Sequence, residues 1–327
     1  MELAIIGSGK LIPTAMEAIA QVPQLTPYAL FVRPQSLEKG KALAEQFHIP
    51  VVYTDYEQLL SDQKVKAVYI ALVNSVHYRY AQQALDRKKH VLMEKPFTVY
   101  TQEAEDLRDR VRRSGTVLME AITPRHTLTY QRLREVLPQL GIIRLVMANF
   151  SQYSSRYDAY LRREVAPAFD PRQQGGALYD MNVYNISILI GLFGKPERIR
   201  YNAVRGFNGV DTSGVLLCQY PHFTASLAAA KNSDGPSFFL IQGEKGWARL
   251  EGPPNEAAAL TVHIGQEEKY FRPAPEKNRM VREFRDFADL AAKPDQAVME
   301  ADLEHTVHTV ELLETAIYGR PIHVLQS

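Results

Sequence analysis

The sequence predicts an α/β protein with an N-terminal doubly wound parallel sheet, followed by an α+β domain with a large, mostly antiparallel open sheet. Up to residue 121, short apolar runs alternate with helical stretches. From residue 122 onward, strand-like runs cluster and the helices are segregated from them. The 327 residues are enough for two ordinary cores. We therefore expect domains at residues 1–121 and 122–327.

The alternation in the first domain is typical of parallel strands joined by helices. The expected strands are residues 3–6, 29–32, 51–52, 67–72, 90–93 and 116–119. The expected helices are residues 13–21, 36–47, 56–61, 77–87 and 102–114. Right-handed crossovers place the carboxyl ends of all such strands along one edge of the sheet. We expect functional side chains to lie at that edge, because open parallel sheets bind their ligands there.

The second domain reads as a strand-rich layer with separate helices. The expected strands are residues 142–152, 198–205, 214–220, 225–230, 238–242, 247–250 and 260–264. Helices are expected at residues 128–137, 176–193, 279–292 and 299–318. The sequence Gly243-Glu244-Lys245-Gly246 lies between two strand-like runs and predicts a hairpin turn.

Composition excludes several classes of partner. The chain has 38 basic and 37 acidic side chains, so its net charge of +1 gives no reason to expect nucleic acid or an anionic membrane. Its apolar runs are too short for a signal peptide or a membrane span. The single cysteine, Cys218, lies in an apolar stretch and is expected to be buried. We therefore expect a cytoplasmic protein. We expect no metal site, because His305 and His308 form a pair that lacks a third ligand.

A glycine-rich turn follows the first strand and opens the first helix. Glycine allows a tight turn and lets the backbone approach a diphosphate, and the helix N-terminus then offers N–H groups. This pattern predicts a Rossmann unit that holds a nicotinamide cofactor. The expected contacts are Gly7, Ser8, Gly9, Lys10 and Leu11. Ile12 stands where the full motif has a small residue, so the turn alone is an incomplete motif.

The end of the second strand indicates which nicotinamide cofactor is bound. NAD is usually recognised by an Asp or Glu at this point. Here the strand ends in Arg33, and the nearest acid, Glu38, already lies in the next helix. Arg33, with Ser36 as a second donor, suits a 2′-phosphate. We therefore predict NADP in preference to NAD, the alternative being that Arg33 is a solvated surface residue.

Two motifs at the ends of the next strands suggest a family. Asn74 and His77 follow the fourth strand, and Glu94-Lys95-Pro96 follows the fifth. This arrangement resembles the glucose–fructose oxidoreductase, inositol dehydrogenase and rhizopine-catabolism (Gfo/Idh/MocA) family over essentially the whole chain. The resemblance implies an NAD(P)-dependent oxidoreductase that transfers hydride between nicotinamide and a secondary alcohol or ketone of a sugar, polyol or cyclic diol. It also implies cofactor contacts from Leu72, Val73, Asn74, His77, Glu94 and Lys95.

The triplet has a clear chemical use in such a family. Lys95 would stabilise an alkoxide and donate to a substrate oxygen, and Glu94 would hold Lys95 in place. A surface ion pair beside a proline is the alternative interpretation.

The segment from Gly175 to Tyr184 resembles the family's Gly-Gly-Ala-Leu-x-Asp-x-Gly-x-His/Tyr pattern. A tyrosine at 184 matches the branches of glucose–fructose oxidoreductase and the dihydrodiol dehydrogenases, where it is the expected acid/base. A phenol titrates near pH ~10, so it needs a cation such as Lys95 to act at neutral pH. Asp180 lies four residues earlier, on the same helix face, and would orient or assist. Asn182 replaces the family's glycine, and we predict that it contacts the substrate, the alternative being that it narrows the pocket.

Further candidates border these motifs. Residues 119–126 resemble the dihydrodiol-dehydrogenase-like branch, so Glu120 and Arg125 are expected beside the cofactor. Residues 169–171, Phe-Asp-Pro, match the same branch. Tyr157 follows the first strand of the second domain and is predicted to reach over the substrate.

Two other functions remain open at this point. A catalytically silent NAD(P)-binding regulatory protein would tolerate the departures at Ile12 and Asn182. An enzyme that recycles a tightly held nucleotide between two substrates is a second alternative. The family pairs open sheets between subunits, so a homodimer or homotetramer through the C-terminal sheet is expected.

Overall fold

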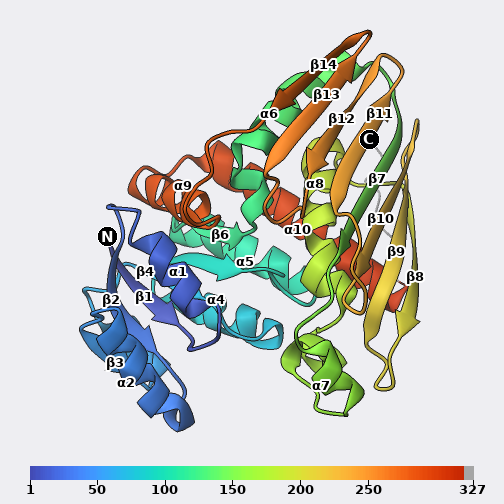
Figure 1. Cartoon of the computed structure of the whole chain (residues 1–327). Coiled ribbons are helices and arrows are strands. Elements are labelled where there is room, and N and C mark those ends of the chain that lie inside the picture. Colours follow the sequence, from blue (N-terminus) through green and yellow to red (C-terminus); the bar gives the residue numbers. More distant parts are fainter. Residues whose placement is uncertain (320–327) are drawn as a thin grey trace. The chain divides into compact units, whose positions relative to one another are not determined.

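The computed structural model describes residues 1–319, which form two units, each built around one sheet (Figure 1). The first unit comprises residues 1–121 and 276–307. The second comprises residues 122–275 together with the described residues from 308 onward. The division into functional domains at 1–121 and 122–327 stays a prediction, and residues 320–327 lie outside the described chain.

The first unit contains a six-stranded parallel sheet in the order β3-β2-β1-β4-β5-β6. Its strands are β1 (Glu2–Ile6), β2 (Thr26–Phe31), β3 (Val51–Tyr53), β4 (Ala67–Ile70), β5 (His90–Glu94) and β6 (Leu118–Ala121). Every neighbouring pair is parallel. The strand order reverses between β1 and β4, and ligands bind at such a reversal in doubly wound sheets. The predicted Rossmann fold is confirmed.

Helices from two distant parts of the chain belong to this unit. From the N-terminal part come α1 (Ile12–Ile19), α2 (Leu37–Gln46), α3 (Tyr56–Ser61), α4 (His77–Asp86) and α5 (Thr101–Ser114). From much later in the chain, α9 (Val281–Ala292) packs against α1 and β6. Phe284 of α9 meets Tyr69 of β4 with ring centroids 5.0 Å apart. Asn278, just before α9, donates a hydrogen bond to the carbonyl of Thr14 at 2.7 Å.

The second unit contains an eight-stranded sheet in the order β14-β13-β12-β11-β7-β10-β9-β8. Its strands are β7 (Ile143–Ser151), β8 (Arg198–Arg205), β9 (Asp211–Gln219), β10 (Thr224–Ala230), β11 (Phe238–Gly243), β12 (Gly246–Glu251), β13 (Ala259–Ile264) and β14 (Glu267–Phe271). Only the β7–β10 pair among these strands is parallel. Gly243 pairs with Gly246, as expected for the predicted hairpin. The large, mostly antiparallel sheet is confirmed.

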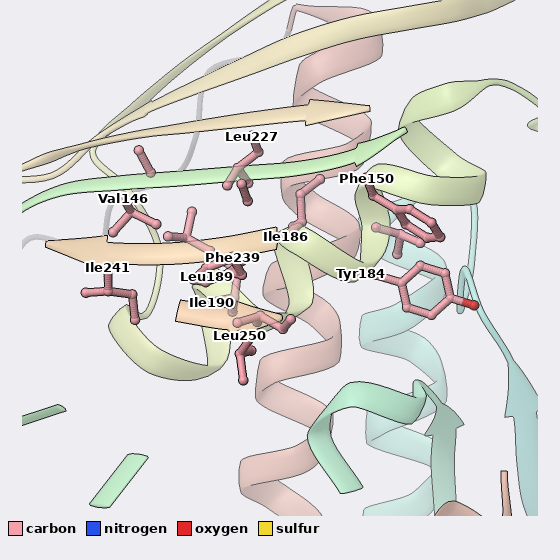
Figure 2. Packing of buried hydrophobic residues seen from close by; sticks show 14 of the residues in the cluster. Val146, Phe150, Tyr184, Ile186, Leu189, Ile190, Leu227, Phe239, Ile241 and Leu250 are labelled. Atoms are coloured by element: carbon pink, nitrogen blue, oxygen red, sulfur yellow. The ribbon is translucent and has the colours of Figure 1, made fainter. Parts of the chain in front are cut away.

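Helices cover one face of this sheet and bury its core. They are α6 (Leu128–Val136) and α8 (Val183–Phe193), with α10 (Gln296–Tyr318) contributing its last residues. In Figure 2, side chains of α8 such as Ile186 and Leu189 lie among those of the strands, including Phe239 and Leu250. Cys218 is also buried there, as expected, and its burial raises the pKa of the thiol to about 12.

Two elements were not expected. The edge strand β14 has the sequence Glu-Glu-Lys-Tyr-Phe, whose charges hide the alternation that marks a strand. The short helix α7 (Tyr157–Leu161) follows β7 directly. None of the described helices is both long and apolar enough to cross a membrane.

Candidate active site

The glycine turn after β1 is shaped by the neighbouring strand. Gly7 has φ +128°, and a Cβ at this position would lie 2.5 Å from the carbonyl oxygen of Ala71, just after β4. At Gly9 a Cβ would meet no described atom within 4 Å. No side chain caps the N-terminus of α1 at Leu11. A close-packed turn, open space and uncapped helix N–H groups are the features that a dinucleotide diphosphate requires, so this edge of the sheet fits the cofactor.

Ile12 departs from the motif without disturbing it. Ile12 is the first residue of α1, and its side chain is fully buried. The position that usually holds a small residue is therefore filled by an aliphatic side chain inside the first unit's core.

Arg33 lies at the exposed end of β2. It precedes a short 3₁₀ turn, Pro34–Ser36, in which the backbone N–H of Ser36 donates to the carbonyl of Arg33 at 2.8 Å. Glu38 forms an exposed ion pair with Lys41 at 2.9 Å. Glu38 is thus engaged by a basic neighbour on its own helix, while Arg33 extends from the strand end.

His77 links the loops that follow β4 and β5. Its Nδ1 lies 3.0 Å from the carbonyl oxygen of Pro96, and its Nε2 lies 3.2 Å from that of Leu72. The ring is fully buried, and burial lowers the pKa of His77 although both carbonyls favour the protonated form. The contact with Pro96 joins His77 to the backbone beside Lys95-Pro96, a peptide bond that is cis.

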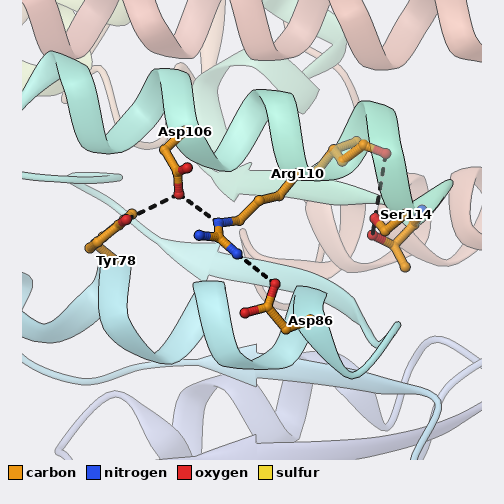
Figure 3. A network of polar contacts seen from close by, with 7 residues as sticks. Tyr78, Asp86, Asp106, Arg110 and Ser114 are labelled. Atoms are coloured by element: carbon orange, nitrogen blue, oxygen red, sulfur yellow. Dashed lines mark hydrogen bonds and ion pairs between the residues drawn. The ribbon is translucent and has the colours of Figure 1, made fainter.

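The helix that begins at His77 is fastened to its neighbour. Figure 3 shows Arg110 of α5 between two carboxylates, Asp106 at 2.6 Å and Asp86 of α4 at 2.5 Å. Tyr78 of α4 donates to Asp106 at 3.0 Å. These contacts fix α4 against α5 and thereby hold the position of the His77 ring.

Two buried carboxylates, those of Glu94 and Glu120, interact with the residues around the Lys95-Pro96 bond. Glu94 is buried and accepts a hydrogen bond of 2.6 Å from the hydroxyl of Tyr69. Burial raises the pKa of Glu94, while Tyr69 and the charge of Lys95 oppose the rise. Glu120, also buried, accepts the backbone N–H of Phe97 at 3.1 Å. Lys95 itself is half-buried at the strand's carboxyl end.

In the second unit, two glycines start the segment that carries Asp180 and Tyr184. A Cβ on Gly175 would lie 2.6 Å from the carbonyl oxygen of Pro167. Gly176 has φ +120°, and a Cβ there would lie 1.9 Å from Oδ1 of Asp211. The other carboxylate oxygen of Asp211 accepts the N–H of Leu178 at 2.7 Å. Gly176 is therefore needed for Asp211 to cap the turn that follows, and Gly175 is needed for the close approach of the Pro167–Ala168 backbone.

The helix expected over residues 176–193 begins later and starts with a different geometry. Residues Leu178–Asn182 form a π-helical turn, and α8 begins only at Val183. The prediction of a single regular helix was wrong, because the backbone of Gly176 is not helical and Asp211 captures the first N–H. π-helical turns of this kind frequently occur at functional sites.

Tyr184 lies at the margin of the core. Its ring packs edge-on against Phe150 with centroids 5.9 Å apart. In Figure 2 its hydroxyl oxygen points away from the packed aliphatic side chains. Asp180, one turn earlier, is 40% exposed at its side chain. The pair thus presents a phenol and a carboxylate from neighbouring turns of the second unit.

The side chain of Asn182 is engaged by hydrogen bonds toward β10. It is fully buried, and its Nδ2 donates to the carbonyl of Leu227 in β10 at 3.0 Å. Its Oδ1 accepts from Asn185 at 2.9 Å, and Asn185 also donates to the carbonyl of Ala228. These contacts attach the π-helical turn to β10, so the substrate contact predicted for Asn182 stays a prediction.

Sequence reasoning missed one charged residue beside Asp180. Lys231, directly after β10, is 2% exposed, and its Nζ lies 2.7 Å from Oδ2 of Asp180. Its only signal in the sequence is a charge that ends an apolar strand.

Tyr157 begins α7 and packs near Phe169, at 5.9 Å between centroids. Arg125 lies in a 3₁₀ turn, Thr123–His126, of the second unit.

The structure therefore gathers the predicted residues into two sets. In the first unit, the glycine turn, His77, Glu94, Lys95 and Glu120 lie at the carboxyl edge of the parallel sheet. In the second unit, Asp180 and Tyr184 share one segment that Asp211 and Lys231 hold. Among the described residues, no group of three or more His, Cys, Asp or Glu side chains could hold a metal ion.

This combination defines a class: a nicotinamide-dependent oxidoreductase with a Rossmann unit and a separate α+β unit. Residues 1–122 match the family described as "Oxidoreductase family, NAD-binding Rossmann fold", and residues 130–249 match "GFO/IDH/MocA C-terminal domain". The chain belongs to the Gfo/Idh/MocA oxidoreductase family, as its resemblance implied. It is an NAD(P)-dependent dehydrogenase or reductase that acts on CH–OH groups.

Relatives of known name are similar over most of the chain. A scyllo-inositol 2-dehydrogenase (NADP(+)) of Bacillus subtilis is 30% identical over 317 residues, covering 97% of this chain and 96% of that protein. A trans-1,2-dihydrobenzene-1,2-diol dehydrogenase of Macaca fuscata fuscata is 31% identical over 82% of this chain and 79% of that protein. A 3-ketoreductase of Actinomadura kijaniata, crystallised with NADP and TDP-benzene, has the same fold, with a TM-score of 0.85 at 21% identity over 98% and 97% of the two chains.

Proposed function

We propose that this enzyme interconverts a secondary alcohol and a ketone on a sugar, polyol or cyclic diol, and that it uses NADP in preference to NAD. The observation that carries the proposal is the Asp180–Tyr184 pair on one segment, in a chain that also keeps Lys95 at the end of β5. Two relatives bear the names of cyclic polyol and diol dehydrogenases, which supports a ring with neighbouring hydroxyl groups as the substrate.

Each of these residues has a proposed role in a balanced reaction. When bound, the nicotinamide accepts a hydride from the carbinol carbon in oxidation, or returns it in reduction. In oxidation, Tyr184 takes the hydroxyl proton as the C–H bond breaks and the C=O bond forms. In reduction, Tyr184 gives that proton back. The Lys95 ammonium group donates to the same oxygen and stabilises its developing negative charge. Asp180 accepts a hydrogen bond from the substrate and orients it.

The remaining predicted contacts are proposed for cofactor and substrate. Those proposed for the cofactor are Gly7, Ser8, Gly9, Lys10, Leu11, Arg33, Ser36, Leu72, Val73, Asn74, His77, Glu94, Lys95, Glu120 and Arg125. Asn182 and Tyr157 are proposed for the substrate. The strongest physical support lies at the glycine turn, where Gly7 allows close packing against Ala71 and Gly9 borders open space that a diphosphate could fill.

Turnover of a substrate panel tests the function. The protein would be mixed with inositols, aldoses and cyclic vicinal diols, with NADP⁺ or NAD⁺ present, and the absorbance of reduced nicotinamide followed. We expect reduction of NADP⁺ by at least one polyol or diol. The proposed function is wrong if no member of the panel reduces either cofactor and, in the reverse direction, no corresponding ketone oxidises NADPH.

A lysine variant tests the proposed chemistry. Lys95→Met should lower turnover by about a hundredfold or more, the effect of removing an electrostatic stabiliser of the transition state. Binding of NADP⁺ should remain close to that of the unmodified protein. Lys66→Met, at an exposed lysine of the same unit, is the matched control. Full activity in Lys95→Met would remove Lys95 from the mechanism.

The cofactor preference is tested at Arg33. A charge-assisted hydrogen bond contributes about 1.5–3 kcal/mol, so Arg33→Ala should raise the Kd for NADP⁺ by about ten- to a hundredfold. The Kd for NAD⁺ should change little. Arg113→Ala, at an exposed arginine of α5, is the control. Equal effects on the two cofactors would contradict recognition of the 2′-phosphate.

We also propose a cytoplasmic homodimer or homotetramer that pairs through the open face of the second sheet. Strand registers align Leu240, Met147, Ser226 and Leu217 in one row across β11, β7, β10 and β9. Met147 and Leu217 are 39% and 38% exposed in the single chain. Three of the four side chains in this row are apolar, and exposed apolar side chains on a wide sheet favour association with a second copy.

A further inference from the structure

Lys231 is held in an unusual setting at the end of β10. The residue is 2% exposed, although a lysine ammonium is rarely buried without compensation. Its Nζ donates to Oδ2 of Asp180 at 2.7 Å and to the carbonyl oxygen of Ala168 at 2.7 Å. The ammonium also lies 4.5 Å from the centroid of the Phe169 ring. A carboxylate, a carbonyl and an aromatic face therefore surround one buried cation.

The two partners in this ion pair differ sharply in exposure. Lys231 has 2% of its side chain exposed, whereas Asp180 has 40% exposed. Lys231 thus binds Oδ2 of the carboxylate from inside the unit, while the Asp180 side chain stays partly exposed. By comparison, the Lys195–Glu311 pair of the same unit, 2.9 Å long, has exposures of 18% and 11% and covers both charges to a similar degree.

We propose that Lys231 is a positioning residue that fixes the Asp180 carboxylate for the reaction. The inference rests on the role proposed for Asp180 in substrate binding. The Lys231 ammonium group stabilises the negative charge of the Asp180 carboxylate and fixes its position, and the partly exposed carboxylate can accept a hydrogen bond from a substrate hydroxyl. Because the ammonium group is covered, Lys231 affects the substrate through Asp180 and not by direct contact.

The same cation connects Asp180 to the aromatic cluster around α7. Phe169, beneath the ammonium group, stacks on Tyr160 at 4.9 Å and contacts Tyr157 at 5.9 Å. The carbonyl of Ala168 precedes Phe169 in the chain and is bound by the same nitrogen. Lys231 therefore ties the carboxylate to the segment against which the proposed substrate contact Tyr157 packs.

A double-mutant cycle tests whether Lys231 acts through Asp180. The variants are Lys231→Met, Asp180→Asn and the two combined, assayed on the best substrate of the panel. We expect Lys231→Met to lower kcat about ten- to a hundredfold, the scale of a small misplacement in an active site, with KM for NADP⁺ unchanged. In the Asp180→Asn background, the same change should have little further effect.

Matched variants separate positioning from folding. Lys195→Met breaks another largely covered ion pair of this unit and should leave kcat near the unmodified value. Lys231→Arg keeps the cation but changes its reach, so it should retain thermal stability while kcat falls. Should Lys231→Met not fold, Lys231→Arg and its combination with Asp180→Asn replace it in the cycle.

The possible results differ in meaning. Unchanged kcat in Lys231→Met or Lys231→Arg, or effects that simply multiply with those of Asp180→Asn, would overturn the proposal. An unmodified protein that is inactive on the whole panel would instead overturn the proposed function. Loss of NADP⁺ affinity in Lys231→Met would also contradict a role that acts through the substrate side alone.

Discussion

At the scale of single residues, buried side chains form hydrogen bonds with the segments that carry the candidate site residues. His77 contacts the carbonyls of Leu72 and Pro96, and Glu120 accepts the N–H of Phe97. In the second unit, Lys231 holds Asp180. These supports restrict the motion of the segments that carry the chemistry, which lowers the reorganisation needed during reaction.

The buried ring of His77 predicts a pH dependence of stability. Burial lowers its pKa in the folded protein below the ordinary 6.5, so the folded state binds fewer protons than the unfolded state. The stabilisation is therefore present above about pH 6.5 and is lost as pH falls through the folded-state pKa. Urea unfolding at about pH 7.5 and about pH 5.5 should show this loss.

A variant identifies the residue responsible. His77→Gln should have a smaller difference in unfolding free energy between the two pH values than the unmodified protein. Some dependence should remain, because burial also lowers the pKa of His90. An unchanged difference in His77→Gln would show that His77 does not titrate with a lowered pKa.

The sequence pointed to candidate site residues through local motifs, but not to the residues that hold them. Lys95, Asp180 and Tyr184 stand in short motifs with fixed spacing, so the local sequence alone singles them out, and their roles stay predictions. Lys231 and Asp211 lie 51 and 33 residues from the groups they bind. Only the folded sheet brings them there, and a charge at the end of an apolar strand does not by itself indicate which group it binds.

At the scale of elements, the start of the Asp180 segment depends on one close approach. Gly176→Ala would place a Cβ 1.9 Å from Oδ1 of Asp211 and would also impose an unfavourable φ of +120°. We expect a large loss of unfolding free energy, because the carboxylate that caps Leu178 would have to move. Catalytic activity should fall with it, since Asp180 is carried by the displaced turn.

The control for this prediction is another glycine with positive φ. Gly194, at the end of α8, has φ +70° but no described atom within 4 Å of a built Cβ. Gly194→Ala should therefore cost only the backbone strain, about 1–2 kcal/mol. Chemical denaturation of the two variants compares them. Equal losses would mean that contact with Asp211 does not constrain Gly176.

The elements themselves were largely predictable. Buried parallel strands are short apolar runs, and their parallel arrangement followed from the alternation with helices, whereas the order of the strands in the sheet was not predicted. The π-helical turn at Leu178–Asn182 and the charged edge strand β14 were not predicted. Both depend on tertiary partners: Asp211 captures the first N–H of the turn, and β13 supplies the pairing that makes residues 267–271 a strand.

At the scale of the whole molecule, the wide sheet of the second unit predicts self-association. Leu217→Glu would place a charge in the exposed row of β11, β7, β10 and β9, and burying that charge against a second copy is unfavourable. We expect light scattering to give an oligomer for the unmodified protein and a monomer for Leu217→Glu. Val298→Glu, at an exposed position of α10 in the first unit, should not change the mass. An unmodified protein that is monomeric would contradict the proposal.

Direct hydride transfer between a hydroxyl-bearing carbon of the substrate and nicotinamide can be followed with an isotope. The measurement uses the best substrate of the panel, deuterated at the carbinol carbon, and determines deuterium in the isolated reduced cofactor by mass spectrometry. We expect one deuterium per reduced cofactor with the unmodified protein, and almost no labelled product with Lys95→Met. Reduced cofactor without deuterium, or none formed from any panel member, would contradict it.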